Sequence, residues 1–114
     1  MKIERFEDII SWQKAKELTI TIYQSFKFNH DFGFRDQIQR ACVSIMNNIA
    51  EGFERKGNKE FKNFLFIAKG SCAEVRSMLY LALNFNYISK PQFVELLPKT
   101  EEISRLLSGL IKTL

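Results

Sequence analysis

The stretch QIQRACVSIMNNIAEGFER, residues 37–55, decides the fold class of this protein. Its apolar residues recur at intervals of three and four, which predicts an α-helix with one buried face. A surface helix has no need for an asparagine and a glutamate beside that face, so the stretch carries more information than an ordinary amphipathic helix. The buried face consists of Ile38, Ala41, Cys42, Ile45, Ile49 and Gly52, and the polar edge consists of Gln37, Ser44, Asn48, Glu51 and Arg55.

The same periodicity recurs in three other segments, so nearly the whole chain is predicted to be helical. We expect helices over about residues 8–26, 34–53 and 59–86, and a fourth that begins after Ser89 and continues to the C-terminal residues. The connections between them are short, and short connections join antiparallel neighbours. The predicted fold is therefore an all-α, antiparallel, up-down-up-down four-helix bundle, with residues 1–114 forming a single domain.

Local signals refine the expected helix ends. Gly33 suits a turn before the second helix, and Asn58 and Ser89 are the candidate N-caps of the third and fourth helices. Pro98 falls inside the fourth helical pattern, where proline removes a backbone hydrogen bond. We therefore expect a kink or a short break at Pro98.

Composition limits the classes of protein to which this chain can belong and indicates its cellular compartment. No apolar run approaches the about 20 residues that span a bilayer, and the first residues lack the apolar region of a signal peptide. Cys42 and Cys72 fall inside apolar helical patterns, where cysteine acts as a small hydrophobe, so we predict reduced thiols and a cytoplasmic location. The net charge of +4 permits a phosphate-bearing partner without requiring one.

The eleven phenylalanines carry more aromatic area than a small bundle can bury internally. Phe28 and Phe32 make the connection at residues 27–33 apolar, so we expect it to pack against the bundle. Apolar residues also lie on second sides of two helices, which predicts a homo-oligomer. The predicted subunit interface consists of Val43, Met46, Ile67, Met78, Leu81 and Phe85.

The residue types needed for metal or nucleophilic catalysis are scarce in this chain. The only histidine, His30, lies in a predicted loop, and no glutamate stands three residues before it, as di-iron bundles require. Ligands for a zinc site are also too few. Cys42 and Cys72 are expected to be buried and inert, and no Gly-rich phosphate loop is present. We therefore expect no enzymatic activity, no metal and no cofactor.

Polar residues on the second and third helices form a candidate cluster, for which two interpretations stand. It is either a buried structural network, with Glu51 paired to Arg40 or Arg55 and Asn48 fixing the register of the helices, or a patch that faces a ligand. The cluster consists of Ser44, Asn48, Glu51, Ser71 and Glu74.

Basic residues recur every seven positions on the third helix, at Lys62, Lys69 and Arg76, so they share one side of it. Seven residues of helix rise roughly 10 Å, a spacing at which cations can follow a phosphate backbone. The alternative is an ordinary solvated lysine face. The candidate nucleic-acid-binding residues are Arg55, Lys56, Lys59, Lys62, Lys69 and Arg76.

Several runs of residues also carry a family resemblance: WQKA at 12–15, SIMNNIAEG at 44–52, KEF at 59–61 and GSCAE at 70–74. The chain resembles the bacterial four-helix bundle family encoded in intervening sequences of 23S ribosomal RNA genes. Gln39 and Met46 depart from the family pattern, which often has arginine and proline there.

The resemblance implies a single-domain bundle that assembles into a homopentamer and has no enzymatic activity. The family is similar to the accessory proteins of diversity-generating retroelements, which bind nucleic acid and a reverse transcriptase. A basic surface that contacts RNA is the role that the resemblance implies.

Two functional hypotheses follow. The first is a cytoplasmic homo-oligomer whose basic surface binds structured RNA or another nucleic acid. The second is an oligomeric scaffold that binds a protein partner through apolar and aromatic edges, its basic charge being incidental. Strong salt dependence of nucleic-acid binding distinguishes the first from the second.

Overall fold

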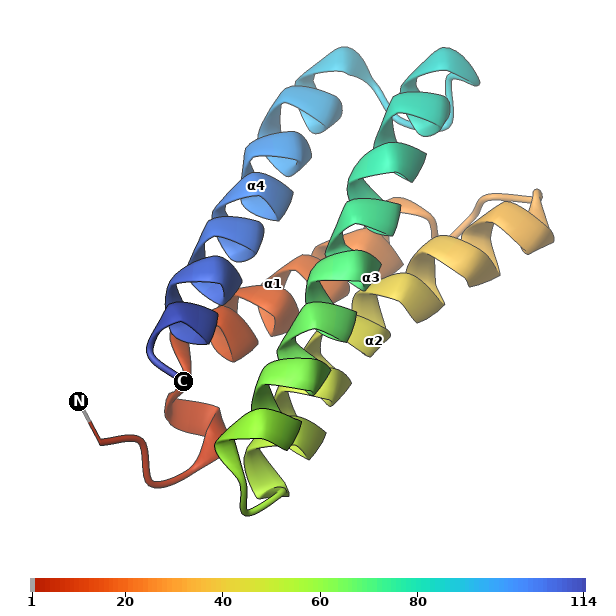
Figure 1. Ribbon diagram of the computed structural model, residues 1–114. Coiled ribbons are helices and arrows are strands. Elements are labelled where there is room, and N and C mark those ends of the chain that lie inside the picture. Colours follow the sequence, from red (N-terminus) through yellow and green to blue (C-terminus); the bar gives the residue numbers. More distant parts are fainter. Residues whose placement is uncertain (1) are drawn as a thin grey trace.

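Four long helices make up the computed structural model, which describes residues 2–114 (Figure 1). After a short 3₁₀ turn, η1 (Phe6–Asp8), the chain forms α1 (Ile10–Ser25), α2 (Phe32–Glu54), α3 (Asn58–Asn84) and α4 (Lys90–Lys112). No strand is present among these residues. The predicted all-α four-helix bundle is confirmed.

Each helix packs against its neighbours in the chain, and α1 and α4 also meet, which closes the bundle. The α2–α3 pair makes the most extensive contact. The molecule is elongated, with principal dimensions of 43 × 23 × 19 Å. Both ends of the chain lie near the α2–α3 turn, away from the α3–α4 turn at the top of the view (Figure 1).

The core is built from the periodic apolar residues of all four helices. The second helix buries the face predicted from its sequence, with Ile38, Ile45 and Ile49 inaccessible to solvent. The largest fully buried side chains are Leu18, Ile22, Phe26, Ile38, Ile45, Ile49, Leu65, Val75, Leu79, Leu96, Ile103 and Leu107.

Helix ends agree with the sequence at α4 and differ at α2 and α3. Ser89 caps α4 as predicted, because its hydroxyl accepts from the backbone N–H of Gln92. Asp31 caps α2 by accepting from the N–H of Phe34 at 3.1 Å, so Gly33 lies in the first helical turn and not in the preceding loop. The N-cap of α3 is Gly57, one residue earlier than predicted.

Pro98 lies within α4, so the break that was one of the two expected outcomes there does not occur. The helix is continuous from Lys90 to Lys112 and contains Pro98 within it. Pro98 and Val94 are both exposed, so water can hydrogen-bond the Val94 carbonyl that lacks its usual N–H partner. This position on the solvent side explains why the helix tolerates the proline.

The α1–α2 connection also differs from expectation, because its two phenylalanines face solvent. Phe28 is 82% exposed and Phe32 is 55% exposed. Phe26 and Phe34 already fill this end of the core, with ring centroids 5.8 Å apart. The loop is anchored by Asp31 instead, which accepts a hydrogen bond of 2.7 Å from the Tyr87 hydroxyl in the α3–α4 turn. That bond lowers the pKa of the Asp31 carboxyl.

The backbones of α2 and α3 approach each other closely where Gly52 of α2 meets Phe64 of α3. A Cβ placed on Gly52 would lie 2.5 Å from the Cβ of Phe64 and 3.1 Å from the Phe61 ring. The Phe64 Cβ is fixed to the α3 backbone and cannot rotate away. Gly52 therefore serves helix packing, and it lies inside α2 because that helix continues to Glu54.

We predict that Gly52→Ala lowers the free energy of unfolding by about 1–3 kcal/mol, because the methyl group must push α2 and α3 apart. The matched control is Gly70→Ala, because among the described residues no atom lies within 4 Å of a Cβ placed there. That control should be more stable than wild type by about 0.5–1 kcal/mol, since glycine is unfavourable within a helix. Urea denaturation followed by circular dichroism measures both, and equal effects of the two substitutions would contradict the packing argument.

Candidate nucleic-acid interface

The predicted basic side of α3 faces α4 and forms one wall of a groove. Lys69 connects the two helices, because its Nζ donates a hydrogen bond of 2.8 Å to the Ser108 hydroxyl. Lys62 and Lys69 are half-buried and Arg76 is exposed. The three residues are one and two heptads apart, so they follow the groove along its length.

The opposite wall of the groove belongs to α4 and is also basic. A hollow of about 400 Å³ lies between Arg76 on α3 and Arg105 and Lys112 on α4, with Glu101 as the one acidic residue of its lining. We call this surface the cationic groove and define it by Lys62, Lys69, Arg76, Arg105 and Lys112. Arg105 and Lys112 were not among the predicted basic residues, although their seven-residue spacing repeats that of Lys62, Lys69 and Arg76 on α3.

The cations of the cationic groove differ from Arg55 in their partners. Arg55 lies 3.3 Å from a Glu51 carboxylate oxygen and 3.7 Å from one of Glu60. By contrast, no cation of the groove lies within 4.0 Å of a carboxylate oxygen in residues 2–114. The charge of Arg55 is therefore offset locally, while the groove keeps its positive charge.

The six predicted basic residues do not form one continuous site: three lie along the cationic groove, and the others lie at or near the end of the bundle. Arg55 and Lys56 line a hollow of about 530 Å³ at the end of the bundle, together with Lys2 and the last residues of the chain. Arg55 also stacks on the Phe64 ring, 5.1 Å from its centroid, on the α2 side of α3. Lys59 is exposed in the first turn of α3, between this end and the groove.

Three residues of the predicted polar cluster form a hydrogen-bonded link between α2 and α3, and the other two, Glu51 and Glu74, make separate contacts. The Ser44 and Ser71 hydroxyl oxygens lie 2.8 Å apart, and the Asn48 amide donates to the Ser44 carbonyl and hydroxyl oxygens at 2.8 and 3.0 Å. Glu74 instead accepts from the Gln37 amide at 3.1 Å, and Glu51 is exposed beside Arg55. The structural interpretation therefore describes Ser44, Asn48 and Ser71, and the Glu51–Arg55 pair that it named is present at the surface, while the five residues do not converge on one point.

The two cysteines are free and buried in the core. Burial raises the pKa of both thiols, that of Cys72 to about 11. The Cys72 thiol also lies 3.2 Å from the Thr100 carbonyl oxygen, to which it donates. Thiols with raised pKa values hold little thiolate at neutral pH, so neither is an activated nucleophile.

His30 is exposed in the α1–α2 connection, beside the Phe32 ring. In the part of the chain that the structure describes, no group of three or more histidine, cysteine or carboxylate residues could hold a metal ion. No helix formed by residues 2–114 has the length and apolarity needed to cross a membrane.

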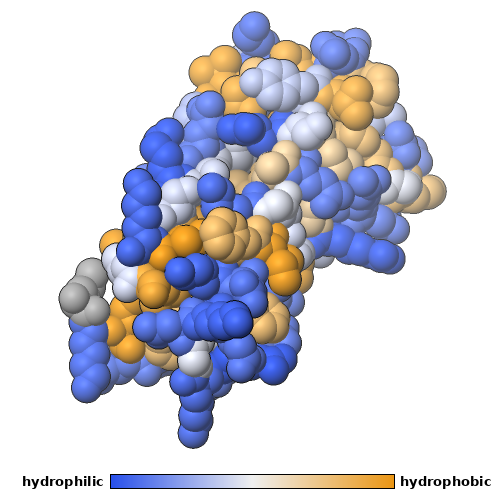
Figure 2. Space-filling view, in the orientation of Figure 1, coloured by the Kyte–Doolittle hydropathy of each residue, from blue (hydrophilic) through white to orange (hydrophobic). Residues whose placement is uncertain are grey.

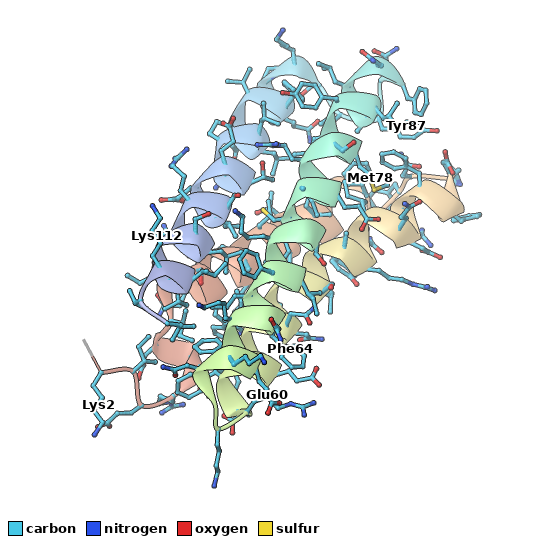
Figure 3. The ribbon with its side chains drawn as sticks, in the orientation of Figure 1. Lys2, Glu60, Phe64, Met78, Tyr87 and Lys112 are labelled. Atoms are coloured by element: carbon cyan, nitrogen blue, oxygen red, sulfur yellow. The ribbon has the colours of Figure 1, made fainter. Side chains whose placement is uncertain are left out.

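The predicted subunit interface divides into exposed and buried residues. Ile67, Leu81 and Phe85 are between 45% and 52% exposed, and Val43 and Met46 are half-buried. Met78 was wrongly predicted, because it is only 7% exposed and belongs to the core where α3 passes α2 (Figure 3). Exposed Ile20 and Tyr23 on α1 were not among the predicted interface residues.

Comparisons with known proteins agree with this architecture. The family model described as 23S rRNA-intervening sequence protein matches residues 7–109, which is most of the chain. This protein belongs to that family. The chain is also similar to a crystal structure of a protein of unknown function from the S23 ribosomal protein family of Bacteroides thetaiotaomicron VPI-5482. The two share 28% sequence identity over 90% of this chain and 96% of that one, with a TM-score of 0.83. Curated proteins give no match.

Family membership confirms the resemblance read from the sequence motifs. Two of those motifs meet in the structure, because the Ser44 hydroxyl of the 44–52 run bonds with the Ser71 hydroxyl of the 70–74 run, and the Asn48 amide donates to Ser44. The similarity to the accessory proteins of retroelements stays a prediction.

We predict that Ser44→Ala and Ser71→Ala each lower the free energy of unfolding by about 1 kcal/mol, and that the double variant loses less than the sum. The physical reason is that both substitutions remove the same hydroxyl–hydroxyl bond. Thermal or urea denaturation of all four proteins measures the coupling. Fully additive losses would show that the pair is not energetically linked.

Proposed function

We propose that this protein is a non-enzymatic, homo-oligomeric bundle that binds RNA or another nucleic acid through the cationic groove. The single observation that carries the proposal is the convergence of basic residues from two helices, because Arg76 of α3 and Arg105 and Lys112 of α4 line one hollow. Lys69 of α3 donates to Ser108 in the same lining, and Lys62 precedes Lys69 by seven residues, on the same side of the helix. The hollow has three cations, Arg76, Arg105 and Lys112, against Glu101, and this positive balance favours an anionic partner.

The shape of the charge supports a polymer with many phosphates over a single small anion. Lys62 and Arg76 are two heptads apart, so the basic residues of α3 extend over roughly 21 Å along the helix axis. A nucleic acid that contacts several cations at once releases several counterions, which strengthens binding at low salt. The family description refers to 23S rRNA, so a structured RNA is the first ligand to test.

We predict that Lys62→Glu/Lys69→Glu weakens binding of a structured RNA and flattens its dependence on salt. Two lost phosphate contacts should reduce the slope of log K against log salt by roughly 1.5 to 2. The losses should be similar for unrelated RNA sequences, because phosphate contacts carry no sequence information. Fluorescence anisotropy at several salt concentrations measures both quantities.

The matched control is Lys16→Glu/Lys27→Glu, which changes the net charge equally at two exposed lysines outside the groove. The control should keep most of the affinity, and circular dichroism should show that both variants keep their helices. Equal losses in the two double variants would mean that only net charge matters, and the groove would then have no specific role.

We also propose that the chain assembles with copies of itself, with five subunits as the family resemblance implies. The support is the apolar area that the single chain leaves exposed on α3 and α1, including Ile67, Leu81 and Phe85. Large exposed apolar patches mark interaction surfaces in soluble proteins. The cytoplasm is the proposed location, in keeping with two free thiols.

We predict that Leu81→Glu lowers the mass of the oligomer while leaving the helices intact, because an unpaired charge is costly in a buried interface. Leu81 is 45% exposed in the single chain, whereas the same change at Met78 would disrupt the core. Val94→Glu is the control, since Val94 is 57% exposed on a different helix. Light scattering after gel filtration reports the mass, and a monomeric wild type at micromolar concentration would refute the assembly.

A scaffold for a protein partner is the second candidate function. The exposed apolar residues favour it, because they would suit a partner protein as well as another subunit. Retention of one protein partner at high salt, together with weak and salt-insensitive RNA binding, would favour this function over the first.

A further inference from the structure

Two exposed aromatic rings lie on the same side of α3 as the basic residues of the cationic groove. Phe66 is 54% exposed and follows Lys62 by four residues, and Tyr80 is 51% exposed and follows Arg76 by four residues. Residues four apart on a helix are neighbours on its surface. The sequence of side chains along this side is therefore cation, aromatic, cation, cation, aromatic.

We propose that the cationic groove binds an unpaired, single-stranded segment of RNA, with bases stacked on Phe66 and Tyr80 and phosphates bound by Lys62, Lys69 and Arg76. The inference rests on the proposed function and names the form of nucleic acid that the groove recognises. Aromatic rings stack well on unpaired bases, whereas the bases of a duplex already stack on one another.

The surroundings of Phe66 leave room for a base. Among its neighbours on the outer side of α3, Gly70 and Ala73 are too small to cover the ring. No atom of the described chain lies within 4 Å of a Cβ placed on Gly70, so the surface beside the ring is open. In Figure 2, apolar atoms on the face formed by α3 and α4 stand among hydrophilic ones.

Tyr80 is held in position by a second ring from α4. The Tyr80 and Phe93 rings meet edge to face, with centroids 5.2 Å apart and planes at 65°. A ring ordered in advance loses less entropy when a base stacks on it. The two stacking positions are 14 residues apart on α3, or roughly 21 Å, which leaves space for several nucleotides between them.

The same arrangement argues against a protein as the occupant of this side of α3. Lysine is depleted in the centres of protein–protein interfaces, because desolvating its ammonium group is costly. Here the Phe66 ring has two lysines, Lys62 and Lys69, within one helical turn of it. Single-stranded nucleic acid uses both features together, the rings for its bases and the cations for its phosphates.

The test compares a fluorescein-labelled single-stranded RNA of 12 uridines with a 12-base-pair RNA duplex. Phe66→Leu keeps the apolar side chain and removes the flat ring, so its affinity for the single strand should fall by about tenfold. Its affinity for the duplex should change less than about twofold, because the phosphate contacts remain. Phe66→Trp should restore or strengthen binding of the single strand, which separates stacking from simple packing.

The matched control is Phe28→Leu, because Phe28 is 82% exposed and lies in the α1–α2 turn, outside the groove. It should bind both RNAs as wild type does. Gel filtration with light scattering on every variant should show an unchanged mass.

Other outcomes overturn the proposal in distinguishable ways. Single-strand affinity of Phe66→Leu equal to that of wild type would remove the stacking role while leaving binding through the groove intact. An equal loss of affinity for the single strand and the duplex would also remove the stacking role of Phe66. A lower oligomer mass of the Phe66→Leu variant would assign Phe66 to a subunit interface. Failure of the wild type to bind either RNA would refute the proposed function itself.

Discussion

The close approach of α2 and α3 at Gly52 is the constraint on which the rest of the structure depends. Because residue 52 has no side chain, Phe64 can lie directly against the α2 backbone. This contact sets the rotation of α3 about its own axis. Positions 64, 71 and 78 then face α2, since they are seven residues apart and share one side of the helix.

The orientation of α3 also determines which of its residues contact α2 and which lie beside α4. It brings the Ser71 hydroxyl within hydrogen-bonding distance of Ser44, and it buries Met78 in the core. It also turns Lys62 and Lys69 toward α4, where Lys69 reaches Ser108. The polar link between α2 and α3 and the cationic groove between α3 and α4 therefore lie on different sides of α3.

Family membership and function have different structural bases in this protein. The motifs that mark the family, around Ser44, Asn48 and Ser71, serve the α2–α3 contact and explain the fold. The proposed function depends on a different side of α3 and on α4, where the basic and aromatic residues lie. Motif recognition therefore identifies the architecture, while the surface residues of this chain carry the chemistry of its partner.

The sequence by itself determined the helices, their order and their buried faces. Apolar periodicity reports which side of a helix avoids water, and residues such as Ser89 act within one turn of the chain, so both are readable without a fold. The sequence also shows the seven-residue spacing of Lys62, Lys69 and Arg76.

Only the tertiary structure decided which residues outside those faces are covered. Met78 is buried because α2 lies over it, and Phe28 is exposed because Phe26 and Phe34 already fill that end of the core. Arg105 and Lys112 join the groove only because α4 packs beside α3. Pro98 is tolerated because it lies on the solvent side of α4. Each of these outcomes depends on how the helices and their connections pack against one another, and no local pattern fixes that packing.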